Sequence, residues 1–189
     1  PVIIVGNISV GGTGKTPFTL WLCRYLQQQG LKPGILSRGY GVKISEPQLV
    51  TSVMSAAVVG DEPLLLAQLT GVPVVVCPKR VSGAEFLLAN TDCNIVICDD
   101  GLQHYALARD LEIVLMDGLR GLGNGWLLPA GPLREGAWRL AAVDLVLSNS
   151  APSPLTPYQL DIIAAPAQPL NDTSSPLSAD CTVALVSGI

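Results

Sequence analysis

A glycine-rich segment near the start of the chain has the composition of a phosphate-binding loop. It follows the apolar run Val2–Val5, ends in Gly14-Lys15-Thr16 and leads into a stretch with helical spacing. Main-chain N–H groups of such a loop can surround phosphate oxygens, while Lys15 would reach the β- and γ-phosphates and Thr16 would bind Mg²⁺. The common spacing has a glycine where Ser9 stands, and a glycine-rich turn with a surface lysine is the alternative. The candidate nucleotide-binding residues are Gly11, Gly12, Thr13, Gly14, Lys15 and Thr16.

Two adjacent carboxylates end an apolar run later in the chain. The run Ile95–Cys98 is followed directly by Asp99 and Asp100. In a parallel sheet, a strand close to the phosphate loop would point its carboxyl end at the same crevice, so either aspartate could hold Mg²⁺ directly or through water. Two like charges side by side are costly without a compensating cation, although an Asp-Asp-Gly turn is the simpler alternative. The sequence leaves open which aspartate touches the metal.

A third candidate is Asp61, in the sequence Gly60-Asp61-Glu62-Pro63 before a leucine-rich stretch. An aspartate at this position, with proline in the first turn, is typical of a helix N-cap. Taken by itself, the pattern favours capping over catalysis.

Three arginines and the single histidine complete the set. Arg38, Arg80 and Arg134 are isolated cations in turn-like settings, which suits clamps on phosphate charge but also fits solvated surface residues. His104 has no metal partner at a suitable spacing and no nucleophile motif nearby, so we interpret it as structural.

The elements that must position these residues follow a βαβ rhythm. Short runs that are apolar throughout indicate strands covered on both faces, and helix-like stretches separate several of them. The sequence therefore predicts an α/β fold of the P-loop NTPase kind, with a mainly parallel sheet flanked by helices. The expected strands are Val2–Val5, Val72–Cys77, Asn94–Cys98, Leu111–Met116, Val143–Leu147 and Thr182–Val186, and the expected helices are Thr16–Gln29, Glu62–Leu69 and Ser82–Ala89.

Two long segments break this rhythm. The glycine-rich stretch Gly118–Glu135 follows a strand, where doubly wound sheets carry ligand loops. The proline-rich stretch Ala151–Asp180 indicates a linker or the start of an arm. We therefore expect a nucleotide-binding domain over residues 1–150, and over residues 151–189 an arm or linker with a terminal strand.

Composition excludes several classes of protein. Of 189 residues, 49% are hydrophobic and 14% charged, and the net charge of −4 argues against a nucleic-acid partner. The five cysteines form no CxxC pair, so a zinc site or a disulfide framework is not expected. Without an apolar run of membrane-spanning length or a signal segment, the chain is predicted to be soluble.

Taken together, the motifs identify a family. In order they are Val5-Gly6-Asn7, Gly14-Lys15-Thr16-Pro17, Ser37-Arg38-Gly39-Tyr40-Gly41, Gly60-Asp61-Glu62-Pro63, Asp99-Asp100-Gly101-Leu102-Gln103-His104 with Arg109-Asp110, and Leu128-Pro129-Ala130-Gly131-Pro132-Leu133-Arg134-Glu135. From Val2 to about Asn149 the chain resembles the tetraacyldisaccharide 4′-kinases. The resemblance implies Mg²⁺-assisted transfer of the ATP γ-phosphate to the 4′-hydroxyl of a tetraacyldisaccharide 1-phosphate, giving lipid IVA at the cytoplasmic face of the Gram-negative inner membrane.

The resemblance also implies residue roles. Asp61 would be the base that activates the acceptor hydroxyl, paired with a histidine from a second lobe that this chain lacks. Arg80 and Arg134 would clamp phosphate charge, and Glu135 would position the acceptor or bind near the metal. Membrane docking would come from an absent N-terminal region, and no obligate protein partner is expected. Residues 1–189 alone should bind nucleotide weakly and transfer little phosphate.

Two other readings stay open at this point. A P-loop GTPase or ATPase switch would act on a protein partner, although Ser148-Asn149-Ser150 lacks the lysine and aspartate of a guanine-reading motif. A nucleotide-binding module without catalytic activity is the other. Transfer of a labelled γ-phosphate to a lipid acceptor would separate all three.

Overall fold

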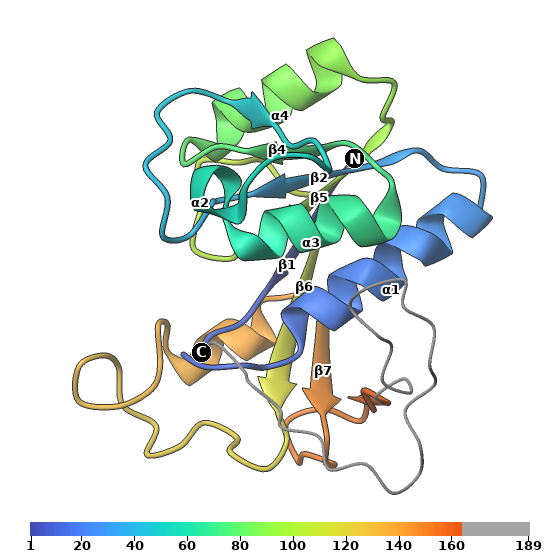
Figure 1. The fold of residues 1–189 in the computed structure, drawn as a ribbon. Helices are drawn as coiled ribbons and strands as arrows, with labels where there is room; N and C mark the ends of the chain where they lie inside the picture. The colour runs from blue at the N-terminus through green and yellow to red at the C-terminus, as the bar shows by residue number, and fades with distance from the viewer. Residues whose placement is uncertain (164–189) are drawn as a thin grey trace, which may run out of the picture.

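The computed structural model describes residues 1–163 and contains one eight-stranded sheet (Figure 1). The strand order is β3-β4-β2-β5-β1-β6-β7-β8, and all neighbours are parallel except β3 and β4. The strands are β1 (Val2–Gly6), β2 (Pro33–Ser37), β3 (Gln48–Leu49), β4 (Val74–Val76), β5 (Ile95–Asp99), β6 (Leu111–Asp117), β7 (Leu145–Asn149) and β8 (Gln159–Leu160). The helices are α1 (Lys15–Gln28), α2 (Ala56–Val59), α3 (Asp61–Thr70), α4 (Arg80–Asn90) and the 3₁₀ helix η1 (Ala137–Ala141).

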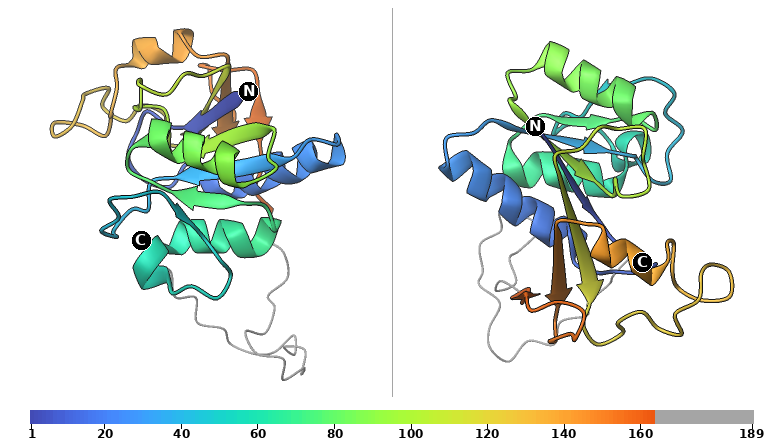
Figure 2. Two further views of the ribbon diagram at one scale, coloured as in Figure 1. Left: turned by 90° about the horizontal axis from the view of Figure 1, so that it is seen from above. Right: turned by 180° about the vertical axis from the view of Figure 1, so that it is seen from behind.

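Helices cover both faces of this sheet (Figure 2). Successive side chains of a strand point to opposite faces, so Ile3 and Val5 of β1 pack into one core with Leu22 of α1 and Leu66 of α3. Ile4 lies in the second core, which includes residues of α4 and η1. Burial on both faces explains why the strands are apolar throughout, and it confirms the predicted α/β class.

Most of the expected strands and helices are present, with ends shifted by a few residues. One central strand, β2, was not predicted from the sequence. It begins with Pro33 and Gly34, which interrupt the apolar pattern, yet all five of its residues are buried. A Cβ atom on Gly34 would lie 2.9 Å from Leu87 and 3.0 Å from Cys93, so only glycine fits where α4 approaches the strand.

The sheet also extends further along the chain than expected. Strand β8, at Gln159–Leu160, pairs in parallel with β7 inside the proline-rich stretch. Residue 150 is therefore not the end of the sheet. The expected strand Thr182–Val186 and the later part of the arm lie outside the described residues.

Two compositional predictions can be compared with the described residues. Cys23, Cys77, Cys93 and Cys98 are free thiols in the interior, and burial raises the pKa of Cys23 and of Cys98 to about 11. Over residues 1–163, none of the helices combines the length and the apolar character needed to cross a membrane.

Candidate functional site

The strand order brings the predicted site residues together at the carboxyl ends of the central strands. Strand β1 lies between β5 and β6, and Val5 of β1 is in register with Asp99 of β5. The carboxyl ends of these parallel strands lead into the phosphate loop, the Asp-Asp-Gly turn and the loop after β6. A segment of this last loop lies against the phosphate loop, because the N–H of Val10 donates to the carbonyl of Pro132 at 2.8 Å.

The phosphate loop has a conformation that depends on its glycines. Gly11 and Gly14 have φ angles of 98° and 87°, which side chains with a Cβ rarely adopt. Gly14 is also the N-cap of the fourteen-residue helix α1, so the first N–H groups of that helix face the loop. Asn7 donates from Nδ2 to the hydroxyl of the buried Thr13 at 3.2 Å, which holds the loop from within. The backbone is thus arranged to receive an anion before any ligand binds.

Two predicted cations converge on Asp100. Lys15 Nζ lies 3.6 Å from Asp100 Oδ1, and Arg134 Nη1 donates to the same oxygen at 2.9 Å. Asp100 has a left-handed φ of 52°, so its backbone leaves the extended conformation of β5. Burial favours the neutral acid, but Lys15 and Arg134 outweigh it and hold the pKa of Asp100 below its usual value.

Asp99 has the opposite environment. It is 2% exposed, and the hydroxyl of Thr19 donates to it at 3.3 Å. Burial, with a further contribution from the Glu62 carboxylate, raises the pKa of Asp99 from 3.8 to about 6, against the smaller opposing effect of Lys15. Within residues 1–163, Asp100 is therefore the member of the acidic pair that forms ion pairs, and Asp99 forms none.

This environment predicts a pH-dependent difference between the wild-type chain and the Asp99→Asn variant. The folded state keeps its proton where the unfolded state has lost it, so the buried acid lowers stability as pH rises from about 4 to about 6. Without nucleotide or divalent cation, the two chains should have similar free energies of unfolding near pH 4. By pH 7 the variant should be more stable by on the order of 3 kcal/mol.

Urea unfolding across this pH range measures the effect. Asp92→Asn is the matched control, because Asp92 is exposed and forms a surface ion pair with Lys32. A difference for Asp99→Asn that does not change with pH would contradict the assigned environment.

Arg80 is a buried cation with unused donors. It is the first residue of α4 and is 3% exposed. Nη1 donates to the Cys77 carbonyl at 2.7 Å, whereas Nε and Nη2 have no partner among residues 1–163. A buried guanidinium in this state is costly unless an anion binds it. The pKa of His104 is lowered mainly by burial. The positive charges of Arg80 and of the exposed Arg38 lower it further.

Glu135 is tied into an ionic network beside the site. It accepts a short hydrogen bond from the Tyr105 hydroxyl, and its Oε2 lies 3.5 Å from Arg139 Nε. Arg139 is 5% exposed and also donates to Glu112, which Arg109 contacts at 2.7 Å. The network fixes the segment that carries Arg134 and Glu135 against β6.

Asp61 lies at the start of α3, but the capping prediction was wrong. Gly60, with a φ of 93°, occupies the N-cap position, and Asp61 is the first helical residue. Its exposed carboxylate accepts from the N–H of Glu62 at 2.9 Å. Asp61 also lines a cavity of about 310 Å³ beside α2 and α3, together with Leu64 and Leu65.

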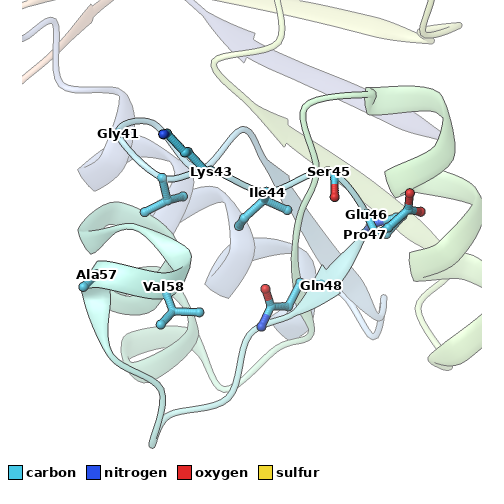
Figure 3. Close-up of a pocket in the computed structure, with 10 residues that line it drawn as sticks. Gly41, Lys43, Ile44, Ser45, Glu46, Pro47, Gln48, Ala57 and Val58 are labelled. Atoms are coloured by element: carbon cyan, nitrogen blue, oxygen red, sulfur yellow. The ribbon is translucent and has the colours of Figure 1, made fainter.

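A second cavity lies apart from the phosphate loop. It has a volume of about 740 Å³ and is formed by residues 41–48 with Ala57 and Val58 of α2 (Figure 3). None of the predicted site residues is among those that line it.

A comparison with protein families identifies the family of this chain. The model for tetraacyldisaccharide-1-P 4′-kinase matches residues 1–189. The chain belongs to the tetraacyldisaccharide-1-P 4′-kinase family. Two relatives named tetraacyldisaccharide 4′-kinase are similar over most of the chain. The relative from Shewanella sp. (strain MR-7) is 55% identical, over 90% of this chain and 51% of its own length. The relative from Alkalilimnicola ehrlichii is 54% identical, over 93% of this chain and 53% of its own length.

A solved member of the family has the same fold. The crystal structure of LpxK from Aquifex aeolicus in complex with ATP superposes with a TM-score of 0.71 and 38% identity, over 78% of this chain and 47% of that one. The chain spans about half the length of the curated relatives it matches.

In this 4′-kinase family member, three residues reach the site that sequence reasoning did not select. Thr19 lies one helical turn after Thr16 and contacts Asp99, and that spacing could have indicated it. Arg120 Nη2 donates to the Gly12 carbonyl at 2.6 Å. Asn149 Nδ2 donates to the Thr13 carbonyl at 3.4 Å. Arg120 lies in the turn after β6 and Asn149 is the last residue of β7, both far from the phosphate loop in the sequence, and no local pattern marks them.

Proposed function

We propose that this chain is the nucleotide-binding part of an ATP-dependent kinase that phosphorylates the 4′-hydroxyl of a tetraacyldisaccharide 1-phosphate. The observation that carries the proposal is the convergence of Lys15 and Arg134 on Asp100 beside the phosphate loop, in a chain that the family model matches throughout. Loop, cations and carboxylates meet at one sheet edge, as phosphoryl transfer requires.

The triphosphate would lie on the loop. The N–H groups of residues 11–16 would bind the phosphate oxygens, and Lys15 would exchange its loose contact with Asp100 for the β- and γ-phosphates. Arg80, with two nitrogens that have no hydrogen-bond partner in the described part of the chain, would neutralise charge on the transferred group, as would Arg134. Arg38, exposed at the end of β2, would reach the phosphates from the neighbouring strand.

The acidic pair fits Mg²⁺. Asp99 is buried and forms no ion pair with any of residues 1–163, whereas Asp100 already pairs with Lys15 and Arg134. Asp99 is therefore the better candidate for the metal-linked carboxylate, and Asp100 for positioning the cations. The hydroxyl of Thr16 would complete the protein ligands. Bound Mg²⁺ would neutralise charge on the β- and γ-phosphates.

The acceptor would approach beside Asp61. Its exposed carboxylate is free to take the proton of the attacking hydroxyl, and the adjoining cavity offers apolar walls from α3. Glu135, held by Tyr105 and Arg139, would orient the acceptor or a metal-bound water. The acceptor is a lipid, so we place the enzyme at the cytoplasmic face of the bacterial inner membrane, without an obligate protein partner.

Transfer of labelled γ-phosphate tests the proposal. The full-length protein, incubated with Mg²⁺, [γ-³²P]ATP and tetraacyldisaccharide 1-phosphate, should yield a labelled lipid product. Release of inorganic phosphate without labelled lipid would favour a nucleotide switch instead. Nucleotide binding with neither product would favour a module without catalytic activity.

A further inference from the structure

Tyr105 links two segments that meet beside the phosphate loop. It lies in the turn that follows Asp100, and its hydroxyl donates a short hydrogen bond to Oε1 of Glu135. The same turn and segment are also joined by the ion pair of Asp100 with Arg134, the residue before Glu135. The Tyr105 hydroxyl is therefore a second link between the acidic turn and the segment that carries Arg134 and Glu135.

The backbone on both sides of this link is held by other contacts. In the turn, the Arg109 side chain donates to the main-chain carbonyl groups of three residues. In the second segment, the N–H of Arg134 donates to the Ile8 carbonyl at 2.7 Å. Loss of the Tyr105 hydroxyl would therefore release the Glu135 side chain and leave both backbones in place.

The ring of Tyr105 is held separately from its hydroxyl. The guanidinium carbons of Arg109 and Arg139 lie 5.4 and 5.6 Å from the ring centroid, within the range of a cation–π contact. Tyr105 is 61% exposed, so phenylalanine would keep the ring contacts and change little in the core. The hydrogen bond to Glu135 raises the pKa of Tyr105, so the hydroxyl keeps its proton and remains the donor.

The second oxygen of the Glu135 carboxylate is buried beside a cation that it does not reach. Glu135 Oε2 and Arg139 Nε lie 3.5 Å apart, and neither atom forms a hydrogen bond with any of residues 1–163. A guanidinium and a carboxylate in direct contact lie about 2.7–2.9 Å apart. Buried polar atoms are rarely left without a partner, so Oε2 is suited to accept a hydrogen bond from a group that enters the site.

We propose that Tyr105 is a positioning residue for phosphoryl transfer, and that its hydroxyl keeps the Glu135 carboxylate from closing on Arg139. Oε2 of Glu135 can then accept from an O–H donor of the reacting complex. The inference rests on the proposed function, in which Glu135 orients the acceptor hydroxyl or a metal-bound water. Phosphoryl transfer depends mainly on such positioning.

Steady-state kinetics of full-length Tyr105→Phe, with Mg²⁺, ATP and tetraacyldisaccharide 1-phosphate, test the inference. The value of kcat should fall about tenfold, the rate equivalent of one hydrogen bond to a charged group, while KM for ATP stays unchanged. The melting temperature should stay the same or rise, because Glu135 gains a closer contact with Arg139. Tyr158→Phe is the matched control: Tyr158 is 57% exposed, precedes β8 and lies outside this network, so its activity should match the wild type.

The crystal structure of Tyr105→Phe gives a readout that does not depend on activity. The distance between Glu135 Oε2 and Arg139 Nε should fall from 3.5 Å to about 2.8 Å. The Mg²⁺ requirement of the variant identifies the O–H donor. A higher Mg²⁺ concentration at half-maximal rate assigns the donor to metal-bound water, and an unchanged one assigns it to the acceptor hydroxyl.

A double-mutant cycle with Glu135→Ala shows whether Tyr105 acts through Glu135. Once the carboxylate is absent, adding Tyr105→Phe should lower kcat no further. The same tenfold loss in the Glu135→Ala background would overturn the inference, as would a wild-type kcat in Tyr105→Phe, an unchanged 3.5 Å distance, or a loss of rate accompanied by a lower melting temperature. A wild-type protein that transfers no phosphate to the lipid would refute the proposed function, whereas an active wild type matched by Tyr105→Phe would refute the positioning role alone.

Discussion

Replacement of Lys15 by alanine is expected to reduce 4′-phosphorylation below measurement in the full-length protein, without unfolding it. Loss of one preorganised group aimed at developing charge typically costs 10²- to 10³-fold in rate, and Lys15 would also bind the triphosphate. The fold should tolerate the change, because the Lys15 contact with Asp100 is loose, at 3.6 Å, and Arg134 still pairs with Asp100 at 2.9 Å. Activity and melting temperature, measured on the same preparation, give the two readouts.

Lys32→Ala is the matched control for Lys15→Ala. Lys32 precedes β2 at the opposite edge of the sheet and pairs with Asp92 on the surface. The Lys32→Ala variant loses one positive charge, as Lys15→Ala does, but the charge lies outside the site. Its activity should therefore match that of the wild type. Activity near the wild-type value in Lys15→Ala would refute the phosphate-loop assignment.

Asp61→Asn is expected to lower kcat by at least about a hundredfold while melting temperature and ATP binding stay unchanged. Loss of a general base typically costs 10²- to 10⁴-fold in rate, because asparagine cannot take the proton. Stability should be retained, since within residues 1–163 the Asp61 carboxylate accepts a single hydrogen bond, from the N–H of Glu62, and an asparagine oxygen can accept it equally well. A change confined to kcat would therefore report chemistry.

Two outcomes would assign Asp61 differently. Unchanged activity would leave it as a surface residue of the first turn of α3. A rate that falls only in step with melting temperature or ATP affinity would make its role structural or metal-linked. Asp92→Asn removes one carboxylate from the opposite edge of the sheet and should leave kcat unchanged.

The sequence by itself determined those features that are local. The spacing of Gly14, Lys15 and Thr16 behind an apolar run indicates a phosphate loop, because the glycines, the lysine and the helix start act within a few residues of one another. Uninterrupted apolar runs likewise indicated buried parallel strands. Strand β2 was not predicted, since Pro33 and Gly34 break its apolar run. Its central position is evident only from the packing of the folded chain.

Only the tertiary structure decided which side chains meet. Arg134 pairs with Asp100 across 34 positions, and Asn149 contacts Thr13 across 136, because crossovers bring the ends of separate strands to one edge of the sheet. Asp99 and Asp100 are identical and adjacent in the sequence, yet their pKa values move in opposite directions. The cause is their surroundings: Asp100 pairs with Lys15 and Arg134, whereas Asp99 is buried and forms no ion pair within residues 1–163. Residue type cannot specify that difference.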